Sequence, residues 1–427
     1  MSTTTYPVTG KASLPTQPHL MHTLLFALWW LLGSILVVIL ALPVLLAFVA
    51  TAIPRYLALG LIILDLAVVI ALFRLKRTWR IILGFWCSVI AVTLLTIWLS
   101  QVFAATPPIL DANNRPLPNS IAVLEKVNLG GSEQWITIRG KDVTKPVLLY
   151  LGIGGPGAGG FPASALSLKP LEDHFVVVNW DQPGTGKSYN AVPISTLTVE
   201  RFVADAHELT QRLRARFHQD KIYVLGLSWG TILGIKLVQQ YPDLFYAYIG
   251  TGQMVNTTEN DRMGYELALR LVTEQGDTAT ANTLRRYGPP PYAGAGMALK
   301  YAVYNNVLFR YMDSPTLQLV LLLVPQFARE YGFVDKVNFA RGLIESYAVI
   351  YPQLRDLDFT TQAAKLGTPI YFLVGRHDVN AMTSLVERYY NMLQAPHKEL
   401  IWLESAHGAT AKEIEDALVN HVLAANP

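Results

Sequence analysis

The sequence predicts an α/β protein with a mostly parallel central sheet, preceded by a membrane region of about three helices. Three observations lead to this prediction. Three apolar stretches lie within the first 104 residues, and short apolar runs alternate with amphipathic helical segments from residue 121 onward. A Gly-x-Ser-x-Gly pattern lies between one such run and the helical segment that follows it. The chain of 427 residues is long enough for a membrane region and one large domain.

The membrane region contains three apolar stretches, which predict membrane-spanning helices over 24–48, 56–73 and 81–103. One helical crossing needs about 20 apolar residues. Four basic residues lie between the second and third stretches, within 74–80. Because basic loops favour the cytoplasmic side, we expect a multi-pass protein of the plasma membrane with a cytoplasmic N-terminus. The domain that follows residue 104 is then extracytoplasmic.

Two features of this region have alternative explanations. A cleaved signal peptide is the rival to the first span. However, that run is longer than the roughly 7–15 residues of a signal-peptide core, and further apolar stretches follow. Asp65 lies within the second span, where a charge is unfavourable. We expect an acid that is protonated or paired between packed helices, in preference to a transport role.

Charge and cysteine content exclude several classes of function. Six of the 34 Lys and Arg residues but one of the 31 acidic residues lie in 1–104, so the formal net charge of +3 belongs to the membrane region. The remainder has no basic stripe of the kind that binds nucleic acid. The lone cysteine, Cys87, lies in an apolar run. It permits no disulfide within the chain, and no Cys/His metal spacing exists, so we expect no metal.

The chain divides at changes in composition and periodicity. Residues 105–120 are rich in Pro and Asn and predict a linker that leaves the membrane region, 1–104. The predicted α/β core has two parts, 121–255 and 365–427. Between them, residues 256–364 interrupt the alternation of strands and helices and predict a mostly helical cap inserted into the core.

The core pattern predicts eight strands and four main helices. The strands are a hairpin, 121–128 with 134–139, and six buried runs, 146–151, 175–180, 222–225, 245–249, 370–374 and 400–403. The helices are 199–217, 231–240, 384–393 and 412–423. Strands that are apolar almost throughout are buried on both faces, as in a parallel sheet covered by helices on either side.

The Gly-x-Ser-x-Gly pattern, Gly226 to Gly230, predicts a nucleophilic serine at Ser228. A tight turn from a strand into a helix lifts the serine Oγ clear of the backbone, and this turn needs small residues two positions before and after the serine. The preceding run and the following helical segment provide that context. An ordinary turn serine is the alternative reading.

The partners of such a serine follow it in the order acid, then histidine. Asp378 and His407 each lie just beyond a predicted strand, where a parallel sheet places its reactive loops. A neutral imidazole takes the serine proton, and a carboxylate stabilises the resulting imidazolium. His377 beside the acid is interpreted as structural, and Glu404 is a weaker candidate for orienting the base.

The oxyanion formed in such a reaction needs two backbone N–H donors. One is expected from Trp229, directly after the serine. The other is expected from the glycine-rich loop 152–157, which follows the strand 146–151. This loop lacks the G-x-G-x-x-G spacing that binds a dinucleotide, so we expect no cofactor.

Three motifs together resemble the prolyl aminopeptidase (proline iminopeptidase) family of α/β-hydrolases. Residues 153–157 are similar to the HGGPG loop of that family, 181–188 to its DQRGxGxS motif and 226–231 to its GxSWGxT elbow. The surroundings of Asp378 and His407 are similar as well. The resemblance implies an α/β-hydrolase fold with a helical cap. It also implies that the Gly155 N–H joins the Trp229 N–H in the oxyanion hole.

The sequence departs from that family at two positions that bear on specificity. Ile153 replaces the histidine of the loop, and Pro183 replaces the arginine of the DQRG motif. An aminopeptidase of this kind also needs cap carboxylates that hold the free ammonium group of the substrate. Glu259 and Glu266 are the candidates, with solvated helix acids as the alternative reading.

These observations predict a membrane-anchored serine hydrolase that works through an acyl-enzyme on small peptides or amino-acid amides, with the bilayer as its second partner. A carboxylesterase or lipid hydrolase at the membrane surface is the first alternative, and a catalytically silent receptor or scaffold is the second. The cap is rich in aromatic residues that would also accept an acyl chain: Tyr265, Tyr292, Tyr301, Tyr304, Phe309, Tyr311, Phe327, Tyr331 and Tyr347. The sequence does not indicate an oligomeric state.

Overall fold

A computed structural model describes residues 17–75, 78–152, 155–161, 168–294, 296–312 and 323–425. The described chain divides into two units. The first contains the residues up to Phe48 together with Pro54–Leu99, and the second contains Val49–Ile53 and the chain from Ser100 onward.

Three apolar helices form the first unit and extend a few residues beyond it: α1 (Gln17–Ala50), α2 (Arg55–Arg74) and α3 (Trp79–Val102). Their apolar windows are Ala27–Ala50, Arg55–Leu72 and Trp79–Val102, with 24, 18 and 24 residues. By length and composition, all three helices can cross a membrane.

An apolar cluster and a hydrogen bond join these helices. Val44, Leu61 and Val92 form a small apolar cluster. The Thr93 hydroxyl donates to the Leu40 carbonyl at 2.7 Å, and thereby links α3 to α1. Asp65 is buried in this unit, on a side of α2 that its neighbours shield. Burial among helices suits an acid whose exposure to lipid would be unfavourable.

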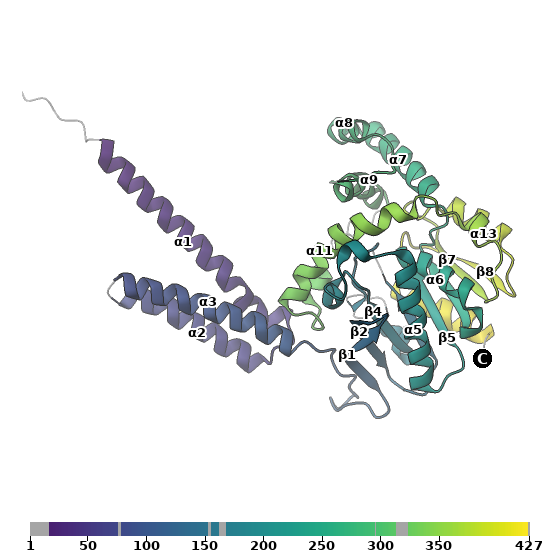
Figure 1. Ribbon diagram of the computed structural model, residues 1–427, viewed down its shortest axis with the longest axis horizontal. Coiled ribbons are helices and arrows are strands. Elements are labelled where there is room, and N and C mark those ends of the chain that lie inside the picture. Colours follow the sequence, from purple (N-terminus) through teal and green to yellow (C-terminus); the bar gives the residue numbers. More distant parts are fainter. Residues whose placement is uncertain are drawn as a thin grey trace, which may run out of the picture. The chain divides into compact units, whose positions relative to one another are not determined.

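The second unit is built on one sheet of eight strands in the order β1-β2-β4-β3-β5-β6-β7-β8 (Figure 1). The strands are β1 (Ile121–Leu129), β2 (Ser132–Gly140), β3 (Val147–Leu151), β4 (Val176–Asp181), β5 (Ile222–Leu227), β6 (Phe245–Thr251), β7 (Ile370–Gly375) and β8 (Lys398–Leu403). β2 pairs antiparallel with β1 and β4, and the other pairings are parallel. All eight predicted strands are present, and the predicted mostly parallel sheet is confirmed.

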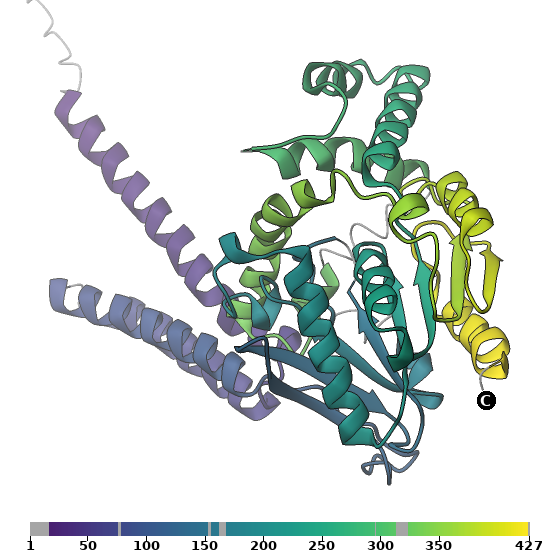
Figure 2. The ribbon, with the colours of Figure 1, turned by 45° about the vertical axis from the view of Figure 1, so that its right-hand side comes forward.

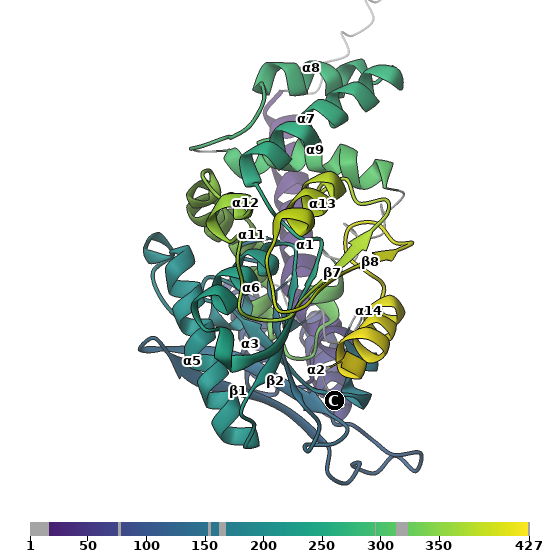
Figure 3. The ribbon, with the colours of Figure 1, turned by 90° about the vertical axis from the view of Figure 1, so that its right-hand side faces the viewer.

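Helices cover both faces of this sheet, because alternate residues of each strand point to opposite sides. Leu149 of β3 and Val224 of β5 belong to the core on one face, whereas Tyr150 and Leu225 belong to the core on the other. The first face carries α5 (Val199–Phe217), α6 (Trp229–Gln240) and α13 (Thr383–Met392). The second carries α14 (Ala411–Ala417) and its π-helical continuation η6 (Leu418–Leu423). Figure 3 shows α5 and α6 to the left of the strands and α14 to the right.

The segment between β6 and β7 is helical and lies above the sheet in Figure 2. Its helices are α7 (Thr257–Glu274), α8 (Thr278–Tyr287), α9 (Met297–Tyr311), α11 (Phe333–Ile350) and α12 (Phe359–Gln362). Side-chain caps fix where two of them begin, since Asn256 accepts from the Glu259 N–H and Asp277 accepts from the Thr280 N–H. Short 3-10 turns complete the second unit: Lys169–Asp173, Gly186–Ser188, Ile194–Thr196, Pro242–Leu244 and Tyr351–Leu354.

Candidate active site

Ser228 stands at a sharp turn between β5 and α6. Its backbone has φ 53° and ψ −116°, a conformation that L-residues rarely adopt. The two motif glycines are required by close backbone contacts. A Cβ atom on Gly230 would lie 1.4 Å from the Leu151 carbonyl oxygen, and one on Gly226 would lie 2.7 Å from the Gly230 carbonyl oxygen. The turn therefore needs glycine at both positions, as the predicted elbow requires.

The structure brings the three predicted residues Ser228, His407 and Asp378 together. Ser228 Oγ lies 3.2 Å from His407 Nε2, and His407 Nδ1 lies 2.9 Å from Asp378 Oδ2. All three side chains are buried. When Nδ1 donates its proton to the carboxylate, the lone pair of Nε2 faces the serine hydroxyl. This arrangement can take the proton of Ser228 as its oxygen attacks a carbonyl carbon.

The loop after β7 holds Asp378 in place. Its Oδ1 accepts from the N–H groups of Asn380, at 2.8 Å, and Ala381, at 2.9 Å, which leaves Oδ2 for the imidazole. Gly375 allows this loop to approach the loop after β8, because a Cβ there would lie 2.2 Å from the Ala406 carbonyl oxygen. The acid and the histidine are thus positioned by two adjacent loops at the carboxyl edge of the sheet.

The side chains of Glu404 and His377 lie outside this site. Glu404 is exposed and accepts from Arg376 at 2.9 Å. His377 is exposed, and its backbone N–H donates to the Ser405 carbonyl. Neither side chain lines the cavity that contains Ser228.

The two residues predicted as oxyanion donors line the cavity that contains Ser228. Trp229 is the first residue of α6, so its N–H has no acceptor within the helix. Gly155 lines the same cavity and has a φ of 97°, which favours glycine. Ile153, which replaces the family histidine, lies outside the described residues.

Asp181 supports the loop that contains Gly155, a role that the sequence prediction did not assign. It is fully buried and accepts from the Gly160 N–H at 3.1 Å, the Lys187 N–H at 2.9 Å and the Tyr331 hydroxyl at 2.8 Å. Burial raises the pKa of this carboxyl to about 7. The sequence did contain a signal for this role, because Asp181 is the first residue of the family-like motif at 181–188.

The second residue of that motif supports Trp229. Gln182 is buried, and its Oε1 accepts from the Trp229 indole N–H at 3.0 Å. Pro183, which replaces the family arginine, is buried in the turn that follows. The motif therefore contacts both elements that carry the predicted oxyanion donors.

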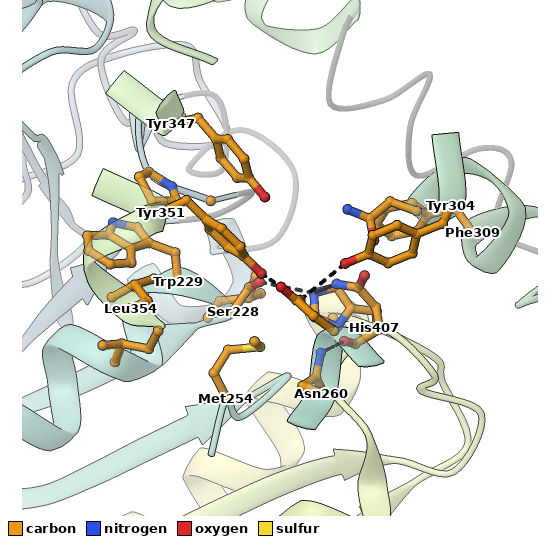
Figure 4. Close-up of a pocket in the computed structure, with 18 of the residues that line it drawn as sticks. Ser228, Trp229, Met254, Asn260, Tyr304, Phe309, Tyr347, Tyr351, Leu354 and His407 are labelled. Atoms are coloured by element: carbon orange, nitrogen blue, oxygen red, sulfur yellow. Dashed lines mark hydrogen bonds between the residues drawn. The ribbon is translucent and has the colours of Figure 1, made fainter. Parts of the chain in front are cut away.

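Ser228 and His407 open into a cavity of about 200 Å³ beneath the inserted helices. This volume is below the roughly 300–1,000 Å³ of pockets for drug-sized ligands, and it suits a small acyl group. Figure 4 shows the hydroxyls of Tyr304 and Tyr351 pointing from opposite sides toward its centre. The lining from the inserted segment is Asn260, Asp261, Tyr304, Asn305, Phe309, Tyr347, Tyr351 and Leu354.

Asp261 is a buried acid in the wall of this cavity, only 3% exposed. Its Oδ1 accepts from the hydroxyls of Tyr351, at 2.8 Å, and Tyr304, at 3.1 Å. Burial raises its pKa to about 6, and the tyrosine hydroxyls oppose that shift. The sequence prediction did not select Asp261. The available signal was an acid on the apolar face of a helix, in line with Gly264 and Ala268.

The structure does not bring Glu259 or Glu266 to the cavity. Glu259 forms an ion pair with Arg388, and Glu266 forms one with Arg262 at 2.8 Å on the exposed side of α7. Both glutamates point away from the face of α7 that carries Asp261. In the part of the chain that the structure describes, no three His, Cys, Asp or Glu side chains group so as to hold a metal ion.

Comparisons with known proteins agree with this fold. A family model described as serine aminopeptidase, S33, matches residues 170–286. Probable aminopeptidase YbaC of Bacillus subtilis (strain 168) is 30% identical over 309 residues, which cover 70% of this chain and 94% of that protein. Proline iminopeptidase of Heyndrickxia coagulans is 25% identical over 267 residues, covering 62% and 85%.

A solved structure shows the same fold. The crystal structure of a proline iminopeptidase-related protein from Thermus thermophilus matches with a TM-score of 0.50 at 19% identity, over 72% of this chain and 99% of that chain. The fold and the family matches together define a hydrolytic enzyme of the α/β-hydrolase superfamily. Because YbaC matches over nearly its whole length, the chain belongs to the same family as that aminopeptidase.

Proposed function

We propose that this enzyme is a membrane-anchored serine hydrolase that removes single N-terminal residues from small peptides or amino-acid amides. Ser228 is the nucleophile, His407 the general base and acid, and Asp378 the group that orients the histidine. The 3.2 Å and 2.9 Å contacts that link the three side chains support these roles. Aminopeptidase-like relatives support the substrate class.

The reaction proceeds in two halves. Ser228 Oγ bonds to the carbonyl carbon while its proton passes to His407 Nε2, and the carbonyl π electrons move to oxygen. The N–H groups of Trp229 and Gly155 stabilise this oxyanion. The C–N bond then breaks, the leaving nitrogen takes the proton from Nε2, and an acyl-enzyme remains. Water repeats the sequence and releases the acid.

The buried carboxylate of Asp261 is the observation that carries the aminopeptidase assignment. It lies in the wall of the cavity that contains Ser228, and its hydrogen bonds come from uncharged tyrosine hydroxyls. Among the described residues, no Lys, Arg or His forms an ion pair with it. A buried carboxylate without a cation favours a cationic ligand. The α-ammonium group of a substrate supplies that cation.

The size of the cavity supports removal of one residue at a time. A volume of about 200 Å³ suits one small aminoacyl group, and the Asp261 carboxylate lies in the wall of this cavity. Esters with long acyl chains fit this cavity less well. Of the aromatic residues predicted in the cap, Tyr304, Phe309 and Tyr347 line the cavity. Tyr265, Tyr292 and Tyr301 instead belong to an apolar cluster within the cap.

The three apolar helices support a multi-pass membrane anchor. The basic residues between α2 and α3 support a cytoplasmic N-terminus and an extracytoplasmic hydrolase domain in the plasma membrane. Asn114 is exposed in the linker and offers a test position. A cysteine at position 114 should react with a membrane-impermeant maleimide in intact cells, with Cys87→Ser as the background. If this cysteine reacted only after the cells were lysed, the hydrolase domain would be cytoplasmic.

Labelling with a fluorophosphonate probe tests the nucleophile. The wild-type enzyme should be labelled and Ser228→Ala should not, with Ser405→Ala as a matched control that keeps labelling. Absence of wild-type labelling, or equal labelling of Ser228→Ala, would refute the proposed mechanism. The aminopeptidase assignment is then tested by comparing the turnover of aminoacyl naphthylamides with that of the same compounds carrying an acetylated amine. The compounds with a free amine should be turned over faster.

A further inference from the structure

Asn380 places a second polar side chain, beside that of Ser228, against Nε2 of His407. It lies in the loop after β7 and lines the cavity that contains Ser228. Its Nδ2 lies 3.2 Å from His407 Nε2, the same distance as Ser228 Oγ. Nε2 is the atom that carries the proton during the proposed reaction. Asn380 therefore lies where the leaving group must pass.

The backbone of Asn380 is fixed, whereas its amide is not. Its N–H donates to Asp378 Oδ1 at 2.8 Å, and its carbonyl accepts from Asn260 Nδ2 at 2.8 Å. Among the described residues, the side-chain amide has one hydrogen bond, to the imidazole. Asn260 differs, because its own Oδ1 also accepts from the Met382 N–H at 2.9 Å and both ends of that amide are engaged.

The amide of Asn380 can therefore present either of its ends. Neutral His407 has one lone pair on Nε2, which faces the NH2 group of Asn380 and the hydroxyl of Ser228. When Nε2 gains the serine proton it becomes a donor, and an NH2 group beside it is then unfavourable. Rotation about the Cβ–Cγ bond exchanges Nδ2 for Oδ1 and turns the amide into an acceptor.

We propose that Asn380 Oδ1 accepts a hydrogen bond from the scissile N–H of the substrate, and so makes the site selective for amides over esters of the same acid. This inference rests on the proposed function and names the bond type that the site prefers. In the tetrahedral intermediate, the nitrogen lone pair must point at the Nε2 proton. The hydrogen already on that nitrogen then points aside, toward the neighbouring amide of Asn380.

The balance of the step is the same with or without Asn380. The C–N bond breaks, its electron pair stays on nitrogen, the proton moves from Nε2 to nitrogen, and the carbonyl re-forms. The original hydrogen stays covalently bound to the nitrogen and leaves with the amine. Until the amine is released, this N–H group remains hydrogen-bonded to Asn380 Oδ1. The alkoxy oxygen of an ester has no such hydrogen. Asn380 therefore lowers the barrier for a secondary amide and not for an ester.

Three substrates with one aminoacyl group that the wild-type enzyme accepts test this inference: the naphthylamide, its N-methyl derivative and the methyl ester. In Asn380→Ala we expect kcat/KM for the naphthylamide to fall about 10- to 100-fold, as for one lost hydrogen bond in a transition state. The ester and the N-methyl amide, which lack the hydrogen, should change less than about twofold by the same reasoning. Asn391→Ala, an exposed asparagine on α13, is the matched control.

Asn380→Asp separates an acceptor role from a donor role, because the variant keeps the oxygen and loses the NH2 group. It should retain most of the amide-to-ester ratio that Asn380→Ala loses. An equal loss for all three substrates would make Asn380 a residue that only positions His407 and would overturn the inference, as would no change. If fluorophosphonate still labels the wild type and Asn380→Ala, such a result leaves the proposed function standing. A wild type without labelling refutes both.

Discussion

The Tyr351 hydroxyl donates a 2.8 Å hydrogen bond to the buried carboxylate of Asp261, in the wall of the cavity that contains Ser228. Tyr304 donates to the same oxygen at 3.1 Å. Uncharged hydroxyl donors satisfy the hydrogen-bonding capacity of a buried carboxylate but do not neutralise its charge. The charge of the carboxylate is thus available to a cationic group of the substrate.

Asp261→Asn should separate substrates by their amino group. We expect kcat/KM for an aminoacyl naphthylamide to fall at least about 100-fold, because a buried charge-assisted contact is lost. The same variant should change hydrolysis of the corresponding acyl naphthylamide without an amine by less than about threefold. Steady-state kinetics on both substrates measure the difference.

Glu259→Gln and Glu266→Gln are the matched controls for that variant. They remove a carboxylate from the same helix but from its exposed side, where each forms a surface ion pair. Surface pairs of this kind contribute little, so both variants should retain wild-type kinetics. If kcat/KM in Glu259→Gln fell as far as in Asp261→Asn, the assignment of the ammonium site to Asp261 alone would be wrong.

The rate should depend on pH through the same carboxyl group. Burial raises the pKa of Asp261 to about 6, so the group is ionised above that pH and protonated below it. The ratio of kcat/KM for amine-bearing and amine-free substrates should therefore fall as the pH drops below about 6. Groups that act on both substrates alike cancel from this ratio. In Asp261→Asn the ratio should be flat between pH 5 and about 7.

Asp261 should also make the folded enzyme less stable at neutral pH. Its folded pKa of about 6 exceeds the unfolded value of 3.8, so the folded state binds more protons between these values and stability falls as the pH rises through them. The full cost, roughly 3 kcal/mol, is present above pH 6 or so. Asp261→Asn should raise the midpoint of thermal unfolding at pH 8, and the gain should shrink toward pH 4. An equal gain in the unfolding midpoint at pH 8 and pH 4 would mean that the ionisation of Asp261 does not cause it.

The fold and the three proposed catalytic residues were predictable because their signals are local. Six strands follow from short apolar runs and two from a hairpin pattern. The elbow at Ser228 follows from two glycines that no larger residue could replace in this turn. Asp378 and His407 follow from their positions just beyond strands in a parallel sheet. Each of these inferences uses residues within one turn or one strand of the site.

The cap residues were not predictable in the same way, because which face of a helix is buried depends on its partners. Glu259 and Asp261 are two positions apart on α7, so they point to different sides of the helix. The sequence prediction chose Glu259 as an acid of the cap, whereas the packing of α7 places Asp261 in the cavity wall. The contact between Asn380 and His407 is likewise tertiary, since it joins two loops that are separated along the chain by α13 and β8.

The ion pair between Lys187 and Asp335 joins the loop after β4 to the first turn of α11. Their side chains are 4% and 9% exposed and lie 2.8 Å apart, and the Lys187 ammonium also lies over the Trp135 ring. Removing one member of a buried pair leaves an uncompensated charge, so Lys187→Met should lower the free energy of unfolding by about 3–5 kcal/mol. Asp335→Leu in the same chain should restore most of the loss, because apolar replacement of both partners is often neutral. Thermal unfolding of the two single variants and the double variant measures the coupling. Additive losses would mean that the two charges do not stabilise one another. The other contacts of α11 with this loop, such as the 2.7 Å hydrogen bond from the Ser346 hydroxyl to the Gly184 carbonyl, would then hold the helix in place.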